Sequence, residues 1–222
     1  MSENLRSRNE ILVGGAVFGA LAVVLTTISQ ALVLSFPLIP YLQFDLGEIA
    51  ILLAFYVFGP VPAVTASFVE FATLMVVGIN VPVGPVLKLV AVLSSLAGMW
   101  FGMSIASRAR SPTIGRAAGL SASVGAVTRA AAMTLANYVV IVAIYTVPGI
   151  VSFVSGSLKL VGITLTEGNA LAVVLGFTFA FNVLQLIFAA GASYILLSLP
   201  QVRNAGVARR SFWMTTYIQG RR

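Results

Sequence analysis

The sequence contains no histidine and no cysteine. Their absence excludes imidazole or thiol catalysis, Cys/His metal sites, haem ligation by these side chains and disulfides. No Gly-xxxx-Gly-Lys-Ser/Thr phosphate loop occurs, and only two lysines are present, so ATP hydrolysis by that route is excluded too. Paired carboxylates at catalytic spacing are also lacking. We therefore expect a protein that is not an enzyme.

Charge is scarce as well. Only 9% of the 222 residues are charged, whereas 59% are hydrophobic, and the mean hydropathy is +1.03. A soluble domain carries about 25% charged residues. The chain could not cover itself with polar surface in water, and we expect an all-α integral membrane protein. The net charge of +7 would suggest nucleic acid in a soluble protein. Here the basic residues are better explained by the lipid bilayer, and no nucleic-acid partner is expected.

Apolar runs divide the chain into six candidate spans within a single membrane domain, residues 1–222. A helical span needs roughly 20 apolar residues, and lipid offers no partner for backbone polar groups, so every span must be a helix. The second run is short and is separated from the third by Gly59 and Pro60. The first run lacks a convincing cleavage site and is interpreted as a span. The predicted spans are residues 11–34, 46–58, 61–77, 85–105, 121–147 and 169–197.

The basic residues predict the orientation of the bundle. Eleven of the 13 fall toward one side, before the first span, between the fourth and fifth, near the start of the fifth (Arg129) and after the sixth, whereas Lys88 and Lys159 fall toward the other. Positive residues concentrate on the cytoplasmic side, so both termini are predicted to be cytoplasmic. Residues 36–45, 78–84 and 148–168 then face outward.

The most informative of these outer segments is residues 36–45. Pro37 and Pro40 exclude a helix there, because proline lacks an amide donor and restricts the preceding residue. The segment is too apolar for an ordinary solvated loop. It is predicted to be an ordered, half-apolar loop that covers a bound molecule.

Among the polar side chains inside apolar spans, four are prominent. They are Glu70, Asn137, Asn182 and Gln185. Such groups usually face the protein interior or a cavity. The amides could simply join helices, at about 0.6 kcal/mol per interaction. Glu70 could be a proton carrier or a paired charge, and the sequence leaves both open.

The first span also carries two pairs of small residues, and the members of each pair are four positions apart. Gly15 with Gly19 and Ala16 with Ala20 would let another helix backbone approach closely. That helix could belong to this chain or to a separate membrane subunit.

With these features in place, the chain resembles the S components of energy-coupling-factor (ECF) vitamin transporters, and among them the riboflavin-specific members. Three stretches carry the resemblance and together cover most of the chain. They are residues 36–45 continuing to Phe58-Gly59-Pro60, residues 133–138 (MTLANY) with Tyr145 beyond, and residues 181–185 (FNVLQ).

The resemblance implies a six-helix bundle in the cell membrane that binds riboflavin near its outer face, under the first loop, without a cofactor. Asn137 and Asn182 match positions that hydrogen-bond the vitamin, and Gln185 stands where riboflavin binders typically have lysine. Ala16 and Ala20 match the motif that docks a membrane T subunit, which is driven by two cytoplasmic ATPases. The residues predicted to bind ligand are Tyr41, Leu42, Gln43, Phe44, Asp45, Lys88, Asn137, Tyr145, Lys159, Asn182 and Gln185, and those predicted to dock the partner are Gly15, Ala16, Gly19 and Ala20.

Two alternatives stay open. The ligand could be another heteroaromatic vitamin, such as a pterin or thiamine, since Gln185 departs from the riboflavin pattern. The chain could also be a secondary transporter or channel that works alone and uses Glu70 to couple protons.

Overall fold

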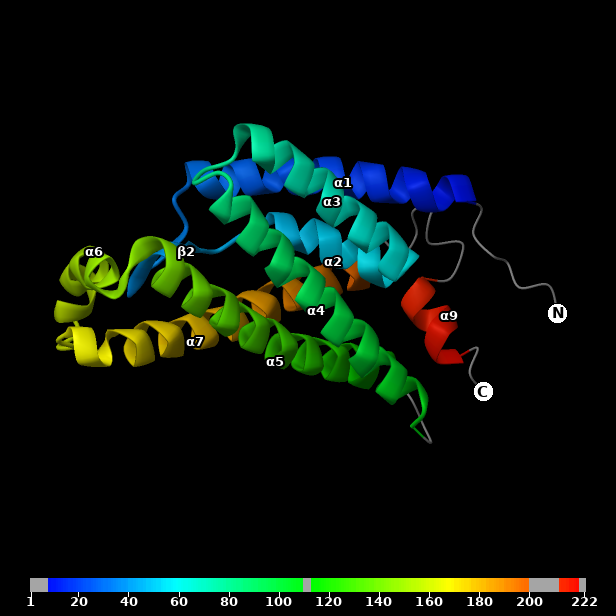
Figure 1. Ribbon diagram of the computed structural model, residues 1–222. Coiled ribbons are helices and arrows are strands. Elements are labelled where there is room, and N and C mark those ends of the chain that lie inside the picture. Colours follow the sequence, from blue (N-terminus) through cyan, green and yellow to red (C-terminus); the bar gives the residue numbers. More distant parts are fainter. Residues whose placement is uncertain (1–7, 110–112, 200–211, 220–222) are drawn as a thin grey trace.

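A computed structural model describes residues 8–109, 113–199 and 212–219. Nearly all of this part is helical, and the helices lie side by side in an elongated bundle (Figure 1). The elements in chain order are α1 (Arg8–Ala31), β1 (Ser35–Phe36), β2 (Ile39–Gln43), α2 (Gly47–Phe58), α3 (Pro60–Val77), α4 (Val83–Ser107), α5 (Ile114–Val140), the π-helix η1 (Ile141–Tyr145), α6 (Val147–Lys159), α7 (Glu167–Ser198) and α9 (Trp213–Gln219).

The helices occupy the six predicted apolar runs to within a few residues, except that α5 begins at Ile114, seven residues earlier than expected. Within the described residues, five helices are long and apolar enough to cross a membrane: α1, α3, α4, α5 with η1, and α7. These helices make the chain a multi-pass membrane protein. The helix α2 has only 12 residues, so the count of six spans stays a prediction.

The break between α2 and α3 lies where the sequence places it. Gly59 has a φ of 100°, a conformation that glycine adopts without steric cost, and Pro60 follows as the first residue of α3. The glycine is also needed for packing, because a Cβ there would lie 3.0 Å from the Trp213 ring of α9. This turn therefore lets α2 and α3 lie against each other inside the bundle.

Residues 36–45 were predicted to form an ordered, half-apolar loop. Most of them form an antiparallel hairpin of β1 and β2, with Phe36 opposite Ile39. The two prolines fit this hairpin because Pro37 lies in the turn and Pro40 lies in the edge strand of a two-stranded sheet. The segment from 148 to 168 also departs from expectation, because its first part is the helix α6.

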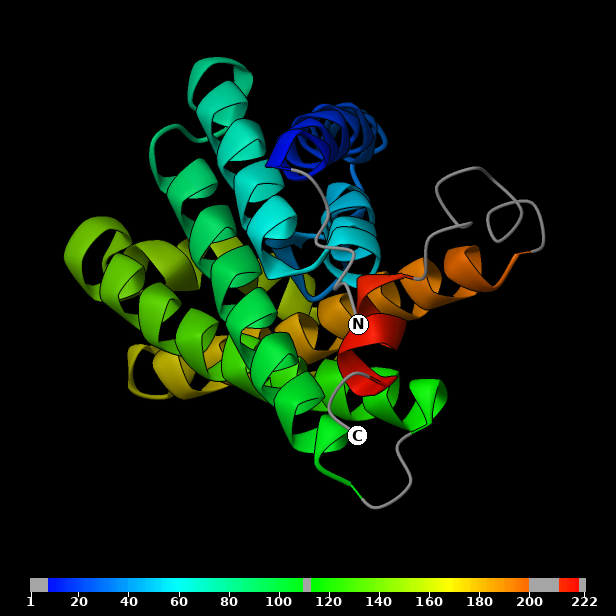
Figure 2. The same ribbon diagram turned by 90° about the vertical axis from the view of Figure 1, so that its right-hand side faces the viewer.

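The two ends of the bundle differ in what covers them. The hairpin and α6 lie at one end, whereas the start of α1 and the helix α9 lie at the other (Figure 1). Seen from that second end, α9 lies across the bundle in front of the long helices (Figure 2). It contacts α2, α4 and α5, and Trp213 packs on Phe55 with ring centroids 5.3 Å apart. The arrangement agrees with both termini being on one side of the membrane, which remains a prediction.

The stripe of small residues in α1 is divided between two faces. Gly15 and Gly19 are buried against α3, and a Cβ at Gly19 would lie 2.7 Å from Val69 Cβ. The docking prediction is therefore corrected for these two glycines, which serve close packing inside the chain. Ala16 and Ala20 are exposed on another face of α1 and stay candidates for docking.

Candidate functional site

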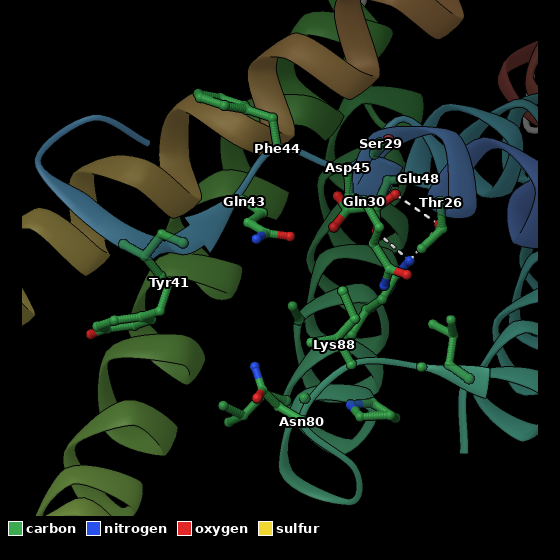
Figure 3. A pocket seen from close by; sticks show the side chains of 18 of the residues that line it. Thr26, Ser29, Gln30, Tyr41, Gln43, Phe44, Asp45, Glu48, Asn80 and Lys88 are labelled. Atoms are coloured by element: carbon green, nitrogen blue, oxygen red, sulfur yellow. Dashed lines mark hydrogen bonds and ion pairs between the residues drawn. The ribbon is translucent and has the colours of Figure 1, made fainter. Parts of the chain in front are cut away.

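A cavity of about 230 Å³ lies below the hairpin, among α1, the start of α2, α4, α5 and α7. The strand β2 continues through Phe44 and Asp45 directly into α2. Side chains of this stretch therefore lie along the cavity (Figure 3). Its lining is Thr26, Ser29, Gln30, Tyr41, Leu42, Gln43, Phe44, Asp45, Glu48, Leu74, Gly78, Ile79, Asn80, Gly84, Pro85, Leu87, Lys88, Ala91, Arg129, Met133, Asn137, Phe181 and Asn182.

The first polar cluster of the cavity is centred on Lys88. Its ammonium group forms an ion pair with Asp45, lies 2.7 Å from Glu70 Oε1 and donates to Thr26 Oγ1 at 2.6 Å. Asp45 also accepts a hydrogen bond of 2.7 Å from the Gly47 amide at the start of α2. The cluster therefore joins α1, the hairpin, α3 and α4 through charges that pair with one another.

The second polar cluster is centred on Arg129, in the middle of α5. Its guanidinium binds Glu48 with both terminal nitrogens, at 2.7 and 2.9 Å, and its Nε donates to Asn182 Oδ1 at 2.9 Å. Ser95 lies 3.3 Å from the same group. All four side chains are buried. Charges in such a place are stable only when paired, so this cluster ties α2 to α4, α5 and α7.

The position of Arg129 corrects the orientation argument. Arg129 was predicted to lie near the cytoplasmic end of the fifth span. Because α5 begins at Ile114, Arg129 is the sixteenth residue of the helix and lies well inside it. It therefore contributes to the cavity and says nothing of the cytoplasmic charge excess.

Gln185 supports the cavity from behind. It is fully buried, does not line the cavity, and donates from Nε2 to the Asp45 carbonyl at 2.9 Å. The Asp45 amide donates back to Gln185 Oε1 at 3.4 Å. This reciprocal pair fixes the backbone at the point where the hairpin enters α2, so Gln185 holds Asp45 in place.

Aromatic side chains join the hairpin to α7. The Phe181 ring lies 5.0 Å from that of Phe44 and 5.6 Å from that of Phe36, in tilted and edge-to-face arrangements that favour attraction. Tyr41 packs near Phe153 of α6. The hairpin is thus held over the cavity mainly by ring contacts at its outer side and by Asp45 at its inner end.

The Tyr41 hydroxyl has no hydrogen-bond partner of normal geometry among the described residues. Burial raises the pKa of this phenol, and the nearby Thr178 side chain lowers that pKa by less. The Thr178 hydroxyl itself donates to the Val174 carbonyl. A buried hydroxyl without a good partner costs about 1–3 kcal/mol. In Figure 3 the Tyr41 hydroxyl points away from Lys88 and Asn80, so it is not directed at the middle of the cavity.

Most of the residues predicted to bind ligand come together at the cavity. Tyr41, Leu42, Gln43, Phe44, Asp45, Lys88, Asn137 and Asn182 all line it.

The other predicted residues lie elsewhere. Gln185 stands behind the cavity, as described. Tyr145 is exposed at the end of η1, and Lys159 is exposed at the end of α6. Neither lines the cavity. The helix α6 packs on β2 and α7, whereas η1 contacts α5 and α6.

Four members of the polar clusters were not identified from the sequence. Glu48, Thr26 and Ser95 were not singled out, and Arg129 was used only for orientation. A signal was present, because a charged residue inside an apolar span is costly and usually faces a partner or a cavity. Applying that rule to Glu48 and Arg129 as well as to Glu70 would have identified both clusters.

No family model and no curated protein matches this chain. A solved structure of the S component of a bacterial ECF transporter is similar to it. The two agree with a TM-score of 0.61 and 21% sequence identity over 86% of this chain and 94% of that chain. At this identity the likeness establishes the fold, which is that of the S component.

Proposed function

We propose that this chain is the substrate-binding S component of an ECF transporter and that it takes up riboflavin. One observation carries the proposal. An aromatic hairpin covers a cavity whose walls combine rings with a few fixed polar groups. Small-molecule sites are typically apolar pockets with a small number of placed polar groups. The proposal assigns binding and transport to the chain, and no chemical reaction.

The cavity offers what a flat heteroaromatic ring with a polyhydroxy chain would need. Tyr41, Phe44 and Phe181 are the aromatic residues of its lining. Asn137 and Asn80 supply hydrogen-bonding groups. The resemblance of residues 36–45, 133–138 and 181–185 to riboflavin-specific S components supports the same ligand.

The size of the cavity has a consequence for binding. Its volume of about 230 Å³ is below the roughly 300–1,000 Å³ of typical ligand sites. Binding of a tricyclic ligand then requires the hairpin to move outward. The contacts that would yield are the ring contacts of Phe36 and Phe44 with Phe181, which are weaker than the buried ion pairs.

The proposed partners are a membrane T subunit and two cytoplasmic ATPases. The exposed face of α1 with Ala16 and Ala20 supports such a contact, since the neighbouring Leu12, Val13 and Val17 are also exposed and apolar. The protein would lie in the cell membrane with both termini in the cytoplasm and the hairpin outside.

Quenching of riboflavin fluorescence by the purified protein tests the proposed ligand. We expect saturable quenching that weakens at least tenfold in Phe44→Ala, because a ring at the cavity is lost. Phe101→Ala is the matched control, since that ring is exposed on α4 and does not line the cavity. Absence of quenching by the unmodified protein would refute riboflavin as the ligand. Equal effects of the two variants would remove the hairpin from the site.

Two outcomes would favour other functions. Quenching by a different heteroaromatic vitamin would retain the S-component proposal with another ligand. Solute flux driven by a pH gradient in liposomes without ATPases would favour a transporter that works alone. Glu70 is the group to test in that case, because it is a buried carboxylate in a membrane helix.

A further inference from the structure

The charges around the cavity do not balance. Three carboxylates, Asp45, Glu48 and Glu70, meet two cations, Lys88 and Arg129, in the two polar clusters. Taken as ionised, the five groups sum to one negative charge. The remaining described lysine, Lys159, is exposed at the end of α6 and does not line the cavity.

The two cations have little left to offer a ligand. All three N–H bonds of Lys88 are directed to Asp45, Glu70 and Thr26. Arg129 uses Nε on Asn182 and both terminal nitrogens on Glu48. An incoming anion would have to displace a carboxylate from these groups, which would leave that carboxylate buried and unpaired.

The groups that remain open are uncharged. Asn137 donates from Nδ2 to the Met133 carbonyl at 2.9 Å, which fixes the amide orientation, and its Oδ1 accepts no hydrogen bond from the described residues. The cavity therefore presents the amide acceptor of Asn137, which suits hydroxyl or N–H groups of a ligand.

We propose that this cavity selects uncharged or cationic ligands and excludes ligands that carry a phosphate or carboxylate. The inference rests on the proposed function, because it treats the cavity as a vitamin site. It adds that phosphorylated forms of the vitamin are rejected by the electrostatics of the clusters. Asp45 and Glu70 are the residues that determine this specificity, since both share the single ammonium group of Lys88.

The expected discrimination is large enough to measure. A phosphate carries about −1.5 to −2 charges at neutral pH. At about 10 Å from one excess negative charge, with an effective dielectric constant of about 20, repulsion corresponds to roughly 70- to 300-fold weaker binding. Salt screening leaves an expected factor of about tenfold or more at physiological ionic strength.

Two pairs of ligands that differ by one phosphate test the proposal in detergent by calorimetry. They are riboflavin with riboflavin 5′-phosphate, and thiamine with thiamine monophosphate. We expect the phosphorylated member to bind at least tenfold more weakly in whichever pair binds. Riboflavin with an uncharged acetyl ester at the 5′ position controls for size, and we expect it to bind more tightly than the phosphate. Equal losses for ester and phosphate would mean that size decides, and would overturn the electrostatic proposal.

Variants separate charge from shape. Glu70→Gln and Asp45→Asn each remove one negative charge with little change in volume, and we expect either to shrink the ratio of the two dissociation constants at least threefold. Glu167→Gln is the control, because this carboxylate is exposed at the start of α7 and outside the cavity. A ratio that stays constant in both cluster variants overturns the proposal, and so does tight binding of a phosphorylated ligand by the unmodified protein.

The same ligand panel tests the riboflavin assignment and the charge selection separately. Binding of thiamine but not riboflavin, with its monophosphate rejected, refutes riboflavin and supports the charge selection. Binding of riboflavin and its phosphate alike supports riboflavin and refutes the selection. Carboxylate vitamins such as biotin are included in the panel as anions. If no uncharged or cationic member of the panel binds, the inference is overturned.

Discussion

The ion pair between Arg129 and Glu48 gives the sharpest prediction about stability. Both side chains are about 4% exposed, and two hydrogen bonds of 2.7 and 2.9 Å join them. Arg129→Met would leave the Glu48 carboxylate buried without its counter-charge. Removing one partner of a buried pair costs about 3–5 kcal/mol. For a chain of this length, that loss corresponds to a melting temperature lower by roughly 6–20 °C.

The double variant Arg129→Met/Glu48→Met distinguishes charge from packing. It removes both charges, and Ser95 keeps its hydrogen bond of 2.6 Å to the Ala91 carbonyl. Only Asn182 Oδ1 then loses its partner, at a cost of about 1–3 kcal/mol. We therefore expect the double variant to be more stable than Arg129→Met alone by about 2 kcal/mol.

Thermal unfolding in mild detergent without ligand measures all three proteins. Arg116→Met is the matched control, because Arg116 is exposed on the same helix and its loss should change stability by no more than about 0.5 kcal/mol. The reasoning fails if Arg129→Met behaves like this control. It fails equally if the double variant is as unstable as the single one.

Three further changes probe the docking face, the cavity and the start of α2. Ala20→Leu should abolish uptake in cells that contain the T subunit and ATPases, while riboflavin binding persists. Gly19→Leu should instead lower the melting temperature, because the leucine side chain collides with α3. An equal loss of binding and uptake in Ala20→Leu would refute docking. Asn182→Ala should weaken binding by about 1–3 kcal/mol in the fluorescence titration, and an unchanged dissociation constant would remove Asn182 from the site. Gly47→Ala should destabilise the protein by about 1–3 kcal/mol, because its Cβ would lie 2.1 Å from Thr26 Oγ1, and normal thermal unfolding would contradict that packing.

The sequence was sufficient to locate the helices, because each apolar run has to become a helix in lipid. It also identified the Gly59–Pro60 break and the importance of residues 36–45. The hairpin itself was missed, because its pairing joins only a few residues and its side chains are apolar on both faces, which leaves no alternating pattern. Pattern reasoning similarly left open which face of α1 packs inside the chain. Both pairs have the same spacing of four residues, but Gly15 and Gly19 are buried against α3, whereas Ala16 and Ala20 are exposed.

The polar clusters could be predicted only in part. Asn137 and Asn182 stood out as amides inside spans, and both line the cavity. The ion pairs could not be assigned, because Glu48 and Arg129 are 81 residues apart and Lys88 could have met any carboxylate of another span. Such pairing depends on how the helices are rotated, which composition does not determine.

The absorbance spectrum of the purified protein between about 350 and 500 nm tests the central claim most directly, because flavins absorb there and apoprotein does not. After gel filtration in mild detergent, the account predicts a double band that travels with the protein and is released on denaturation, or that forms when riboflavin is added and survives a second filtration. A protein that stays colourless after riboflavin is added and does not quench its fluorescence would contradict the assignment of riboflavin.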